Sequence, residues 1–125
     1  MVKTFTMVLG VVLLLVGVLG FVLNPTDGNL LGIFAVNGPH NWIHVLSGIL
    51  GIAAASMGFA KMYCQIFGIV YLLVAVLGLA MVGSEGMLLG LVHLNAADHV
   101  LHLAIGAASA YFGFAAQTAP TPARG

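Results

Sequence analysis

The chain has 125 residues, of which 62% are hydrophobic and only 5% are charged. A soluble domain has about 25% charged residues, so most of this surface cannot face water and must face lipid. Three basic and three acidic residues leave no net charge, which excludes nucleic acid as a partner. The single cysteine, Cys64, excludes an intramolecular disulfide, and its place in an apolar run favours a small buried side chain.

The first apolar run, from Phe5 to Leu23, predicts a transmembrane helix. About 20 apolar residues span the hydrocarbon core of a bilayer, and this run exceeds the apolar core of a secretory signal. Residues 24–28 then predict a turn. The short apolar segments 29–36 and 87–94 cannot span a bilayer, so we expect them to lie at its interface or to dip in and return, packed on protein.

Three more transmembrane helices are expected. The second begins near Gly38 and ends near Ala60, where Lys61 closes it, and the third runs from about Tyr63 to Gly83. The fourth begins after Asn95 and ends near residue 116. Residues 117–125 contain two prolines and little apolar content, which predicts a disordered cytoplasmic tail.

A repeat with an offset of 58 positions divides the chain into two halves. Apolar matches arise easily by chance, but matched glycines, an asparagine, a histidine and an acid in one register indicate duplication of a two-helix unit. The sequence therefore predicts an all-α integral membrane fold of four transmembrane helices in two tandem repeats. The single domain covers residues 1–116, with repeats at about 5–60 and 63–116, related by an axis along the membrane normal.

Charge predicts the orientation of this bundle. The basic residues all fall on one expected side of the membrane and the acidic residues on the other: Lys3, Lys61 and Arg124 against Asp27, Glu85 and Asp98. Basic residues mark the cytoplasmic side, so both termini are expected in the cytoplasm. Small residues at i, i+4 spacing, such as Ser47, Gly51 and Ala55, predict close helix packing within the bundle or on a partner subunit.

Two polar motifs stand at matching positions of the two repeats: residues 37–44 and residues 95–102. Asn37 and Asn95 are predicted N-caps, because an asparagine side chain accepts from the free N–H groups of a first helical turn. Asp98 lies three residues after Asn95, where a carboxylate favours a helix start. Asn41 is also assigned as a structural cap.

Capping does not explain the histidines. His44 and His102 each lie seven residues after the asparagine, roughly 10 Å down the helix axis. At i, i+4 spacing His40 falls beside His44, and Asp98 beside His102. Ionisable residues inside a membrane usually face the bundle interior, so we expect His44 and His102 to face one another across the repeat axis, with both motifs toward the outer face.

Three roles for these histidines stay open. The favoured one is a structural network, in which they hydrogen-bond to Asn41, to Asp98 or to a backbone carbonyl of the other repeat. The second is a ligand site: His44 and His102 as axial ligands of haem or bacteriochlorophyll, or a divalent-metal site. The third is a proton or solute pathway. The candidate metal ligands are His40, His44, His99, His102 and Asp98. His93 has no match in the first repeat and is expected at the membrane interface.

The glycine, asparagine and histidine pattern of residues 32–48, followed by that of residues 95–106, resembles a bacterial family of small four-helix membrane proteins known as domain of unknown function 4383. The resemblance covers about residues 5–116. It implies a four-helix fold in the bacterial cytoplasmic membrane and implies no activity. The family often has asparagine after the aspartate of the second motif, whereas this chain has His99, which adds an imidazole there.

No nucleophile elbow, phosphate loop or paired-carboxylate site is present in the sequence, so no catalytic residue is assigned. We therefore expect a small non-enzymatic membrane protein, an accessory or scaffold subunit of a larger membrane complex. Its partners would be the lipid bilayer and other membrane subunits or further copies of itself. The alternatives are a haem-, pigment- or metal-binding protein and a small proton or solute pathway.

Overall fold

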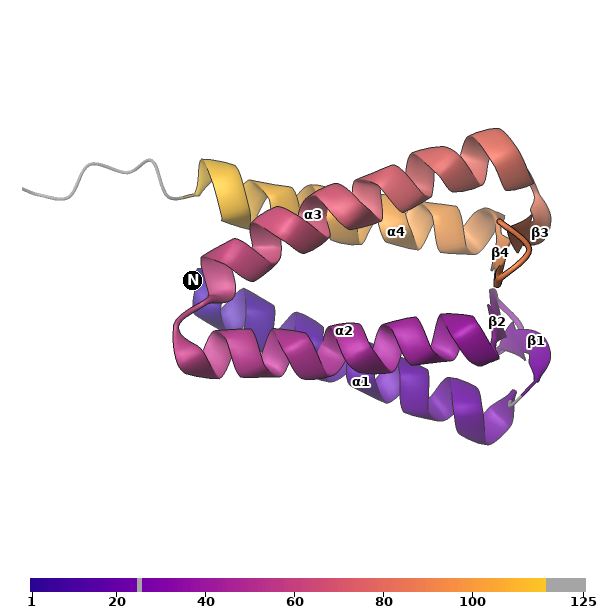
Figure 1. Ribbon diagram of the computed structural model, residues 1–125, viewed down its shortest axis with the longest axis horizontal. Coiled ribbons are helices and arrows are strands. Elements are labelled where there is room, and N and C mark those ends of the chain that lie inside the picture. The colour runs from indigo at the N-terminus through magenta and orange to yellow at the C-terminus, as the bar shows by residue number, and fades with distance from the viewer. Residues whose placement is uncertain (25, 117–125) are drawn as a thin grey trace, which may run out of the picture.

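The structure, a computed structural model, describes residues 1–24 and 26–116. Arg124 and the expected disordered tail lie outside these residues. The described chain forms four α-helices: α1 (Val2–Leu23), α2 (Gly38–Met57), α3 (Ala60–Leu77) and α4 (Ala96–Ala110). Two π-helical turns, η1 (Gly78–Val82) and η2 (Tyr111–Ala115), extend α3 and α4. The helices form two pairs, α1 on α2 and α3 on α4 (Figure 1).

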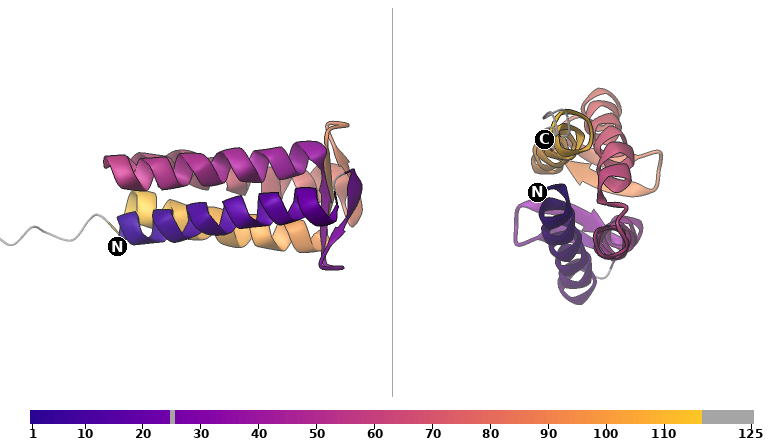
Figure 2. Two further views of the ribbon diagram at one scale, coloured as in Figure 1. Left: turned by 90° about the horizontal axis from the view of Figure 1, so that it is seen from below. Right: turned by 90° about the vertical axis from the view of Figure 1, so that its left-hand side faces the viewer.

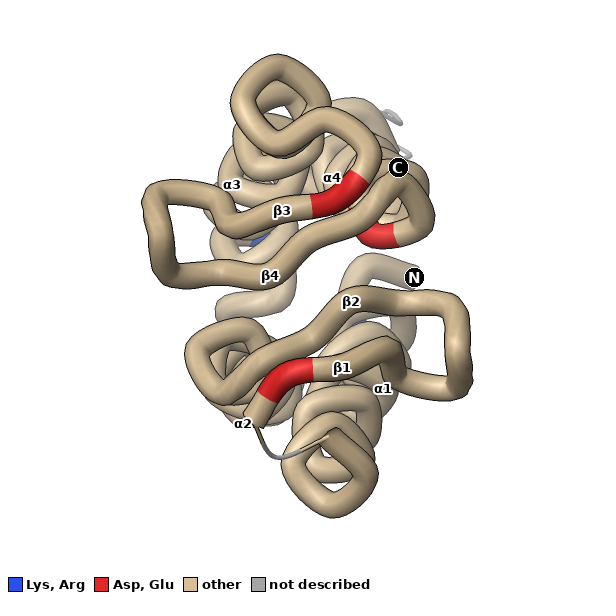
Figure 3. The backbone as a smooth tube through the Cα atoms, turned by 90° about the vertical axis from the view of Figure 1, so that its right-hand side faces the viewer, with Lys and Arg blue, Asp and Glu red and all other residues tan. Residues whose placement is uncertain are grey.

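Two β-hairpins lie across one end of the bundle. Strand β1 (Asp27–Leu30) pairs antiparallel with β2 (Phe34–Asn37), and β3 (Glu85–Leu88) pairs antiparallel with β4 (Val92–Asn95). Strands β2 and β4 lie side by side at the centre (Figure 3). The sequence patterns predicted short interfacial or re-entrant segments here and missed the strands. Their turns lack the Asn-Gly or Asp-Gly signal of a hairpin, although pairing satisfies the backbone polar groups of both segments.

The boundary between α2 and α3 also differs from the prediction. Helix α2 ends at Met57, and Gly58 follows in the left-handed region at φ 86°. Helix α3 begins at Ala60, so Lys61 lies in the first turn of α3 and does not close α2. The reason is that glycine takes a positive φ without the steric cost that a Cβ adds, which makes it a favoured helix stop.

The internal repeat is visible in the element order. The first residues of β1 and β3, Asp27 and Glu85, are 58 positions apart, as are the last residues of β2 and β4, Asn37 and Asn95. Matching positions meet between the halves: Thr6 Oγ1 lies 3.1 Å from the buried Sγ of Cys64, which is 58 positions later. The predicted duplication of a helix pair is therefore seen in the fold, each pair with its own hairpin.

Helix α1 and the helical segment Ala60–Met81 are long and apolar enough to cross a membrane, which suggests membrane association. The helices run lengthwise and antiparallel, with both hairpins at one end and the start of α1 and the end of η2 at the other (Figure 2). The acidic Asp27 and Glu85 lie on the hairpins (Figure 3), whereas Lys3 and Lys61 lie in the first turns of α1 and α3, at the opposite end of the bundle.

Each hairpin turn holds a leucine in the left-handed backbone region. Leu31 has φ 56° and Leu89 has φ 54°, and their side chains are 70% and 71% exposed. A left-handed conformation costs a residue with a Cβ roughly 1–2 kcal/mol, and asparagine tolerates it best among such residues. Leu31→Asn is therefore expected to raise the free energy of unfolding by about 1 kcal/mol in thermal melts, whereas Leu91→Asn, at an exposed position where φ is not positive, should give no gain. Equal effects of the two substitutions would contradict this.

Candidate metal site

The two predicted N-caps are confirmed. Asn37 Oδ1 accepts a hydrogen bond from the backbone N–H of His40 at 3.1 Å, and Asn95 Oδ1 accepts one from Asp98 at 3.0 Å. The Asp98 carboxylate accepts in return from the backbone N–H of Asn95 at 3.0 Å, which completes a capping box. Asp98 therefore acts at the start of α4, as its spacing from Asn95 predicted.

The amide groups of both asparagines also bind the opposite repeat. Asn37 Nδ2 donates to the carbonyl oxygen of Leu91 at 2.8 Å, and Asn95 Nδ2 donates to that of Ile33 at 2.8 Å. Each asparagine thus caps its own helix and holds the turn of the other hairpin. This reciprocal contact joins the two hairpins into one cover over the end of the bundle, which places the polar motifs of the two repeats against each other.

Asn95→Ala is expected to lower the free energy of unfolding by about 2 kcal/mol. The substitution removes an N-cap, worth about 1 kcal/mol, and the bond to Ile33, worth about 1 kcal/mol. Asn95→Ser is the matched control, because serine also caps a helix but has no amide group to donate to Ile33. Chemical unfolding in one detergent should place Asn95→Ser between the other two proteins. Equal stabilities for Asn95→Ser and Asn95→Ala would show that the N-cap does not contribute to the free energy of unfolding.

Asn41 and His99, which occupy matching positions, hold the ends of the preceding helices. Asn41 lies inside α2, and its Nδ2 donates to the carbonyl oxygen of Asn24 at 3.3 Å, so it does not cap α2 but satisfies the end of α1. His99 Nε2 donates to the carbonyl oxygen of Gly83 at 2.7 Å, just after η1. His99 is therefore the hydrogen-bond donor in the second repeat that Asn41 is in the first. Its position does not support the role of metal ligand that was considered for it.

His93 lies at the contact between the hairpins. Its Nδ1 is 2.6 Å from Asp27 Oδ1 of the first repeat, and its Nε2 is 3.1 Å from Glu85 Oε1 of the second. Its carbonyl oxygen lies 2.9 Å from His40 Nδ1. The sequence suggested only a membrane-interface residue, since pairing between hairpins had not been predicted.

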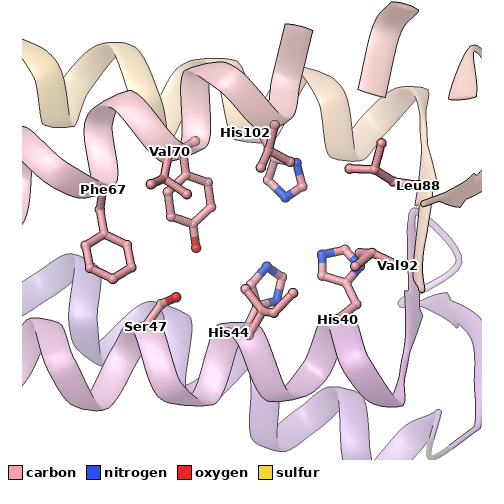
Figure 4. Close-up of a pocket in the computed structure, with 11 residues that line it drawn as sticks. His40, His44, Ser47, Phe67, Val70, Leu88, Val92 and His102 are labelled. Carbon is pink, nitrogen blue, oxygen red and sulfur yellow. The ribbon is translucent and has the colours of Figure 1, made fainter. Parts of the chain in front are cut away.

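Three of the five candidate metal ligands come together: His40 and His44 of α2 and His102 of α4. All three are buried, and each offers one ring nitrogen such that the three nitrogens lie within 4.8 Å of one another (Figure 4). The ring centroids are 4.5 Å apart for His40 and His44 and 6.3 Å apart for His44 and His102. The expected i, i+4 contact and the expected approach across the repeat axis are both present.

Each histidine of this cluster has one buried ring nitrogen that no described residue binds. His40 Nδ1 donates to the carbonyl oxygen of His93, which leaves the lone pair on Nε2. That Nε2 and the buried Nδ1 atoms of His44 and His102 have no hydrogen-bond partner in the part of the chain that the structure describes. The expected hydrogen bonds to Asn41 and Asp98 do not form there, because these side chains bind Asn24 and Asn95. An unpaired buried polar atom costs about 1–3 kcal/mol, so three in one cluster make it a candidate ligand site.

A cavity of about 150 Å³ adjoins the cluster between α2, α3 and α4 (Figure 4). The imidazoles lie at its hairpin end, and Ser47 and Tyr71 also line it. The remaining lining residues are apolar. The arrangement offers neutral nitrogen donors beside an apolar space, which suits a metal ion with room for one further ligand.

Residues 3–115 match a protein family described as a domain of unknown function, DUF4383. The chain belongs to this family. The DUF4383 match includes both helix pairs, both hairpins and the three-histidine cluster, so the whole candidate site lies within the family domain. No curated protein and no solved structure matches the chain.

Proposed function

We propose that this DUF4383 protein is a small integral membrane protein that binds one divalent transition-metal ion through His40, His44 and His102. The observations that carry the proposal are three buried imidazoles that each offer one ring nitrogen within 4.8 Å of the others, and one ring nitrogen on each of them that no described residue binds. Helix α2 of the first repeat supplies two ligands and α4 of the second supplies one. The ion would therefore join the two halves of the fold.

The cluster is close to coordination geometry. A triangle with sides of 4.8 Å has its centre roughly 2.8 Å from each corner, whereas zinc–imidazole bonds are about 2.0–2.1 Å long. A side-chain shift of less than about 1 Å closes that difference. Imidazole suits zinc, copper, iron and nickel. The bond from His40 Nδ1 to the His93 carbonyl is the usual outer support that orients a metal-binding imidazole.

All four helices are proposed to cross the bilayer. Helix α2 has 20 residues, and α4 and η2 together run from Ala96 to Ala115 with 15 and 5 residues, so each spans about 30 Å. Both run beside the apolar helices α1 and α3 and expose large apolar side chains, among them Leu46, Ile49, Val100 and Leu103. Lys3 and Lys61 support cytoplasmic termini in a bacterial inner membrane, which places the hairpins and the metal site toward the outer face.

The geometry favours an ion over a macrocycle. Pockets for drug-sized ligands start at roughly 300 Å³, about twice the cavity beside this cluster, and haem and bacteriochlorophyll are larger than many such ligands. The ring of His40 also lies 5.7 Å from that of His102, in the region that a macrocycle between His44 and His102 needs. The accessory-subunit role and the proton pathway stay predictions. Exposed apolar helix faces suit lipid and partner helices equally, so they favour neither of these roles.

A cobalt titration tests the proposal. The chain is purified in a maltoside detergent, stripped with chelator and titrated with Co²⁺ while its absorption is followed. The expected result is one ion per chain for the unmodified protein and at least about a 10-fold weaker affinity for His102→Ala, which lacks one ligand. The control is His99→Asn, which places in the second repeat the residue that the first repeat has and should bind normally. Equal binding by the unmodified chain and His102→Ala would refute the proposed site.

A further inference from the structure

We propose that the free coordination position of this metal ion takes the carboxylate of an aliphatic amphiphile, such as a fatty acid, whose chain enters from the bilayer between α2 and α3. The inference rests on the proposed metal site and names the ligand class of that site. Four features carry it: the number of protein ligands, their charge, the lining of the adjoining cavity and the position of its mouth.

The cluster leaves a coordination position open. Sites with three protein ligands keep a further position for water or substrate, whereas structural zinc sites close with four. His40, His44 and His102 are the ligand group found among the described residues. Their rings point into the same space as the side chain of Ser47 (Figure 4), and Tyr71 also lines that space. A fourth ligand therefore approaches from the cavity.

Charge favours an anion in that position. Three imidazoles are neutral ligands, and no acidic side chain lines the cavity in the described parts of the chain. The nearest acid in the same motif, Asp98, accepts from the backbone N–H of Asn95. A doubly charged ion in apolar surroundings is costly unless an opposite charge accompanies it. A carboxylate supplies that charge, and the hydroxyl groups of Tyr71 and Ser47 provide polar partners for its second oxygen.

The rest of the cavity fits a hydrocarbon chain that comes from the side. Its walls include the apolar side chains of Ile43, Phe67, Val70 and Val74. Ile43 of α2 and Val70 of α3 are 45% and 44% exposed, so they mark a mouth on the lipid-facing surface. Helices α2 and α3 meet near Gly58 and diverge toward the hairpins (Figure 1), while Leu88 and Val92 of the second hairpin border the cavity.

The size of the cavity limits what it holds. At about 15 Å³ of such space for each water-sized group, 150 Å³ accommodates on the order of ten non-hydrogen atoms. That is a carboxylate and the first part of its alkyl chain, so the remainder of a longer chain would extend into the bilayer. Affinity should therefore rise with chain length as far as hexanoate and level off for much longer chains.

The test uses the Co²⁺-loaded protein in maltoside and follows its visible absorption while acetate, butanoate or hexanoate is added. Hexanoate is expected to shift the spectrum, with an affinity that rises roughly threefold for each methylene group added to acetate. Hexan-1-ol, which has the chain without the charge, should give no shift. Val70→Trp fills the cavity and should remove the hexanoate response with Co²⁺ still bound. Val76→Trp, at an exposed position of α3 outside the cavity lining, is the matched control and should respond normally.

The outcomes separate the two proposals. A chain that binds no Co²⁺ refutes the metal site itself. Bound Co²⁺ with a spectrum that hexanoate does not change refutes the amphiphile and leaves the metal site in place. Equal affinities for acetate and hexanoate would show that the alkyl chain is not buried in the cavity. A normal hexanoate response in Val70→Trp would show that hexanoate binds outside the cavity. Either of these last results overturns the inference.

Discussion

Gly48→Ala is expected to lower the free energy of unfolding by about 2 kcal/mol. A Cβ on Gly48 would lie 2.7 Å from the carbonyl oxygen of Gly10 and 2.8 Å from the Cα of Leu14, both on α1. These are backbone atoms, so α1 and α2 would have to move apart. Overpacking of this kind costs about 1–3 kcal/mol and sometimes more, against a gain of about 1 kcal/mol in helix propensity.

The repeat provides a second test of the same contact. Gly106, which matches Gly48, would place a Cβ 2.7 Å from the backbone nitrogen of Leu72 on α3, so Gly106→Ala should have a similar cost. Gly38→Ala is the control, because a Cβ at Gly38 of α2 would meet no atom within 4 Å. Thermal or denaturant unfolding of the three variants in one detergent measures the effect. A Gly48→Ala protein as stable as Gly38→Ala would show that α1 and α2 do not pack this closely.

Zinc is expected to stabilise the unmodified chain by about 4 kcal/mol at a free concentration 1,000 times its dissociation constant, because the ion binds the folded state alone. His44→Leu should abolish that gain. In metal-free protein the same substitution should leave stability unchanged or raise it, since it replaces an unpaired buried imidazole with an apolar side chain of similar size. Thermal melts with zinc and with chelator measure both quantities.

The comparison also separates a metal ligand from a structural histidine. If His44 held the fold through hydrogen bonds, His44→Leu would destabilise the chelated protein, and zinc would change both proteins equally. The matched variant is His99→Leu, which removes the bond to the Gly83 carbonyl. The free energy of unfolding of His99→Leu should be about 1–3 kcal/mol lower than that of the unmodified chain in chelator. Zinc should still stabilise this variant as much as the unmodified chain. The opposite pattern for these two histidines would reverse their roles.

The helices and the repeat were predictable because the chain contains long apolar runs, and duplication left matched polar residues 58 positions apart. The hairpins were not. Their turns place Leu31 and Leu89 at positive φ, where a sequence pattern leads one to expect glycine or asparagine. The end of α2 was misplaced by a few residues, since Gly58 is one glycine among 17 and only its backbone conformation marks it as the stop.

The site was predictable in part. Helical spacing and the repeat axis together brought His40, His44 and His102 to one place, as the i, i+4 and pseudo-twofold relations required. The same reasoning gave Asp98 and His99 as further ligands. Their actual partners, the backbone of Asn95 and the carbonyl of Gly83, depend on where the preceding segments end, and local spacing does not contain that information. The reciprocal bonds of Asn37 and Asn95 depend on the unpredicted hairpins in the same way.

X-ray absorption spectroscopy of the zinc-loaded protein, with His99→Asn and His102→Ala beside it, tests the metal site most directly. The expected spectrum has three imidazole nitrogens and one oxygen at about 2.0–2.1 Å, unchanged in His99→Asn and reduced by one imidazole in His102→Ala. A zinc shell with no more than one imidazole, or one that His102→Ala leaves unchanged, would show that the ion binds elsewhere and that the three buried histidines are not its ligands.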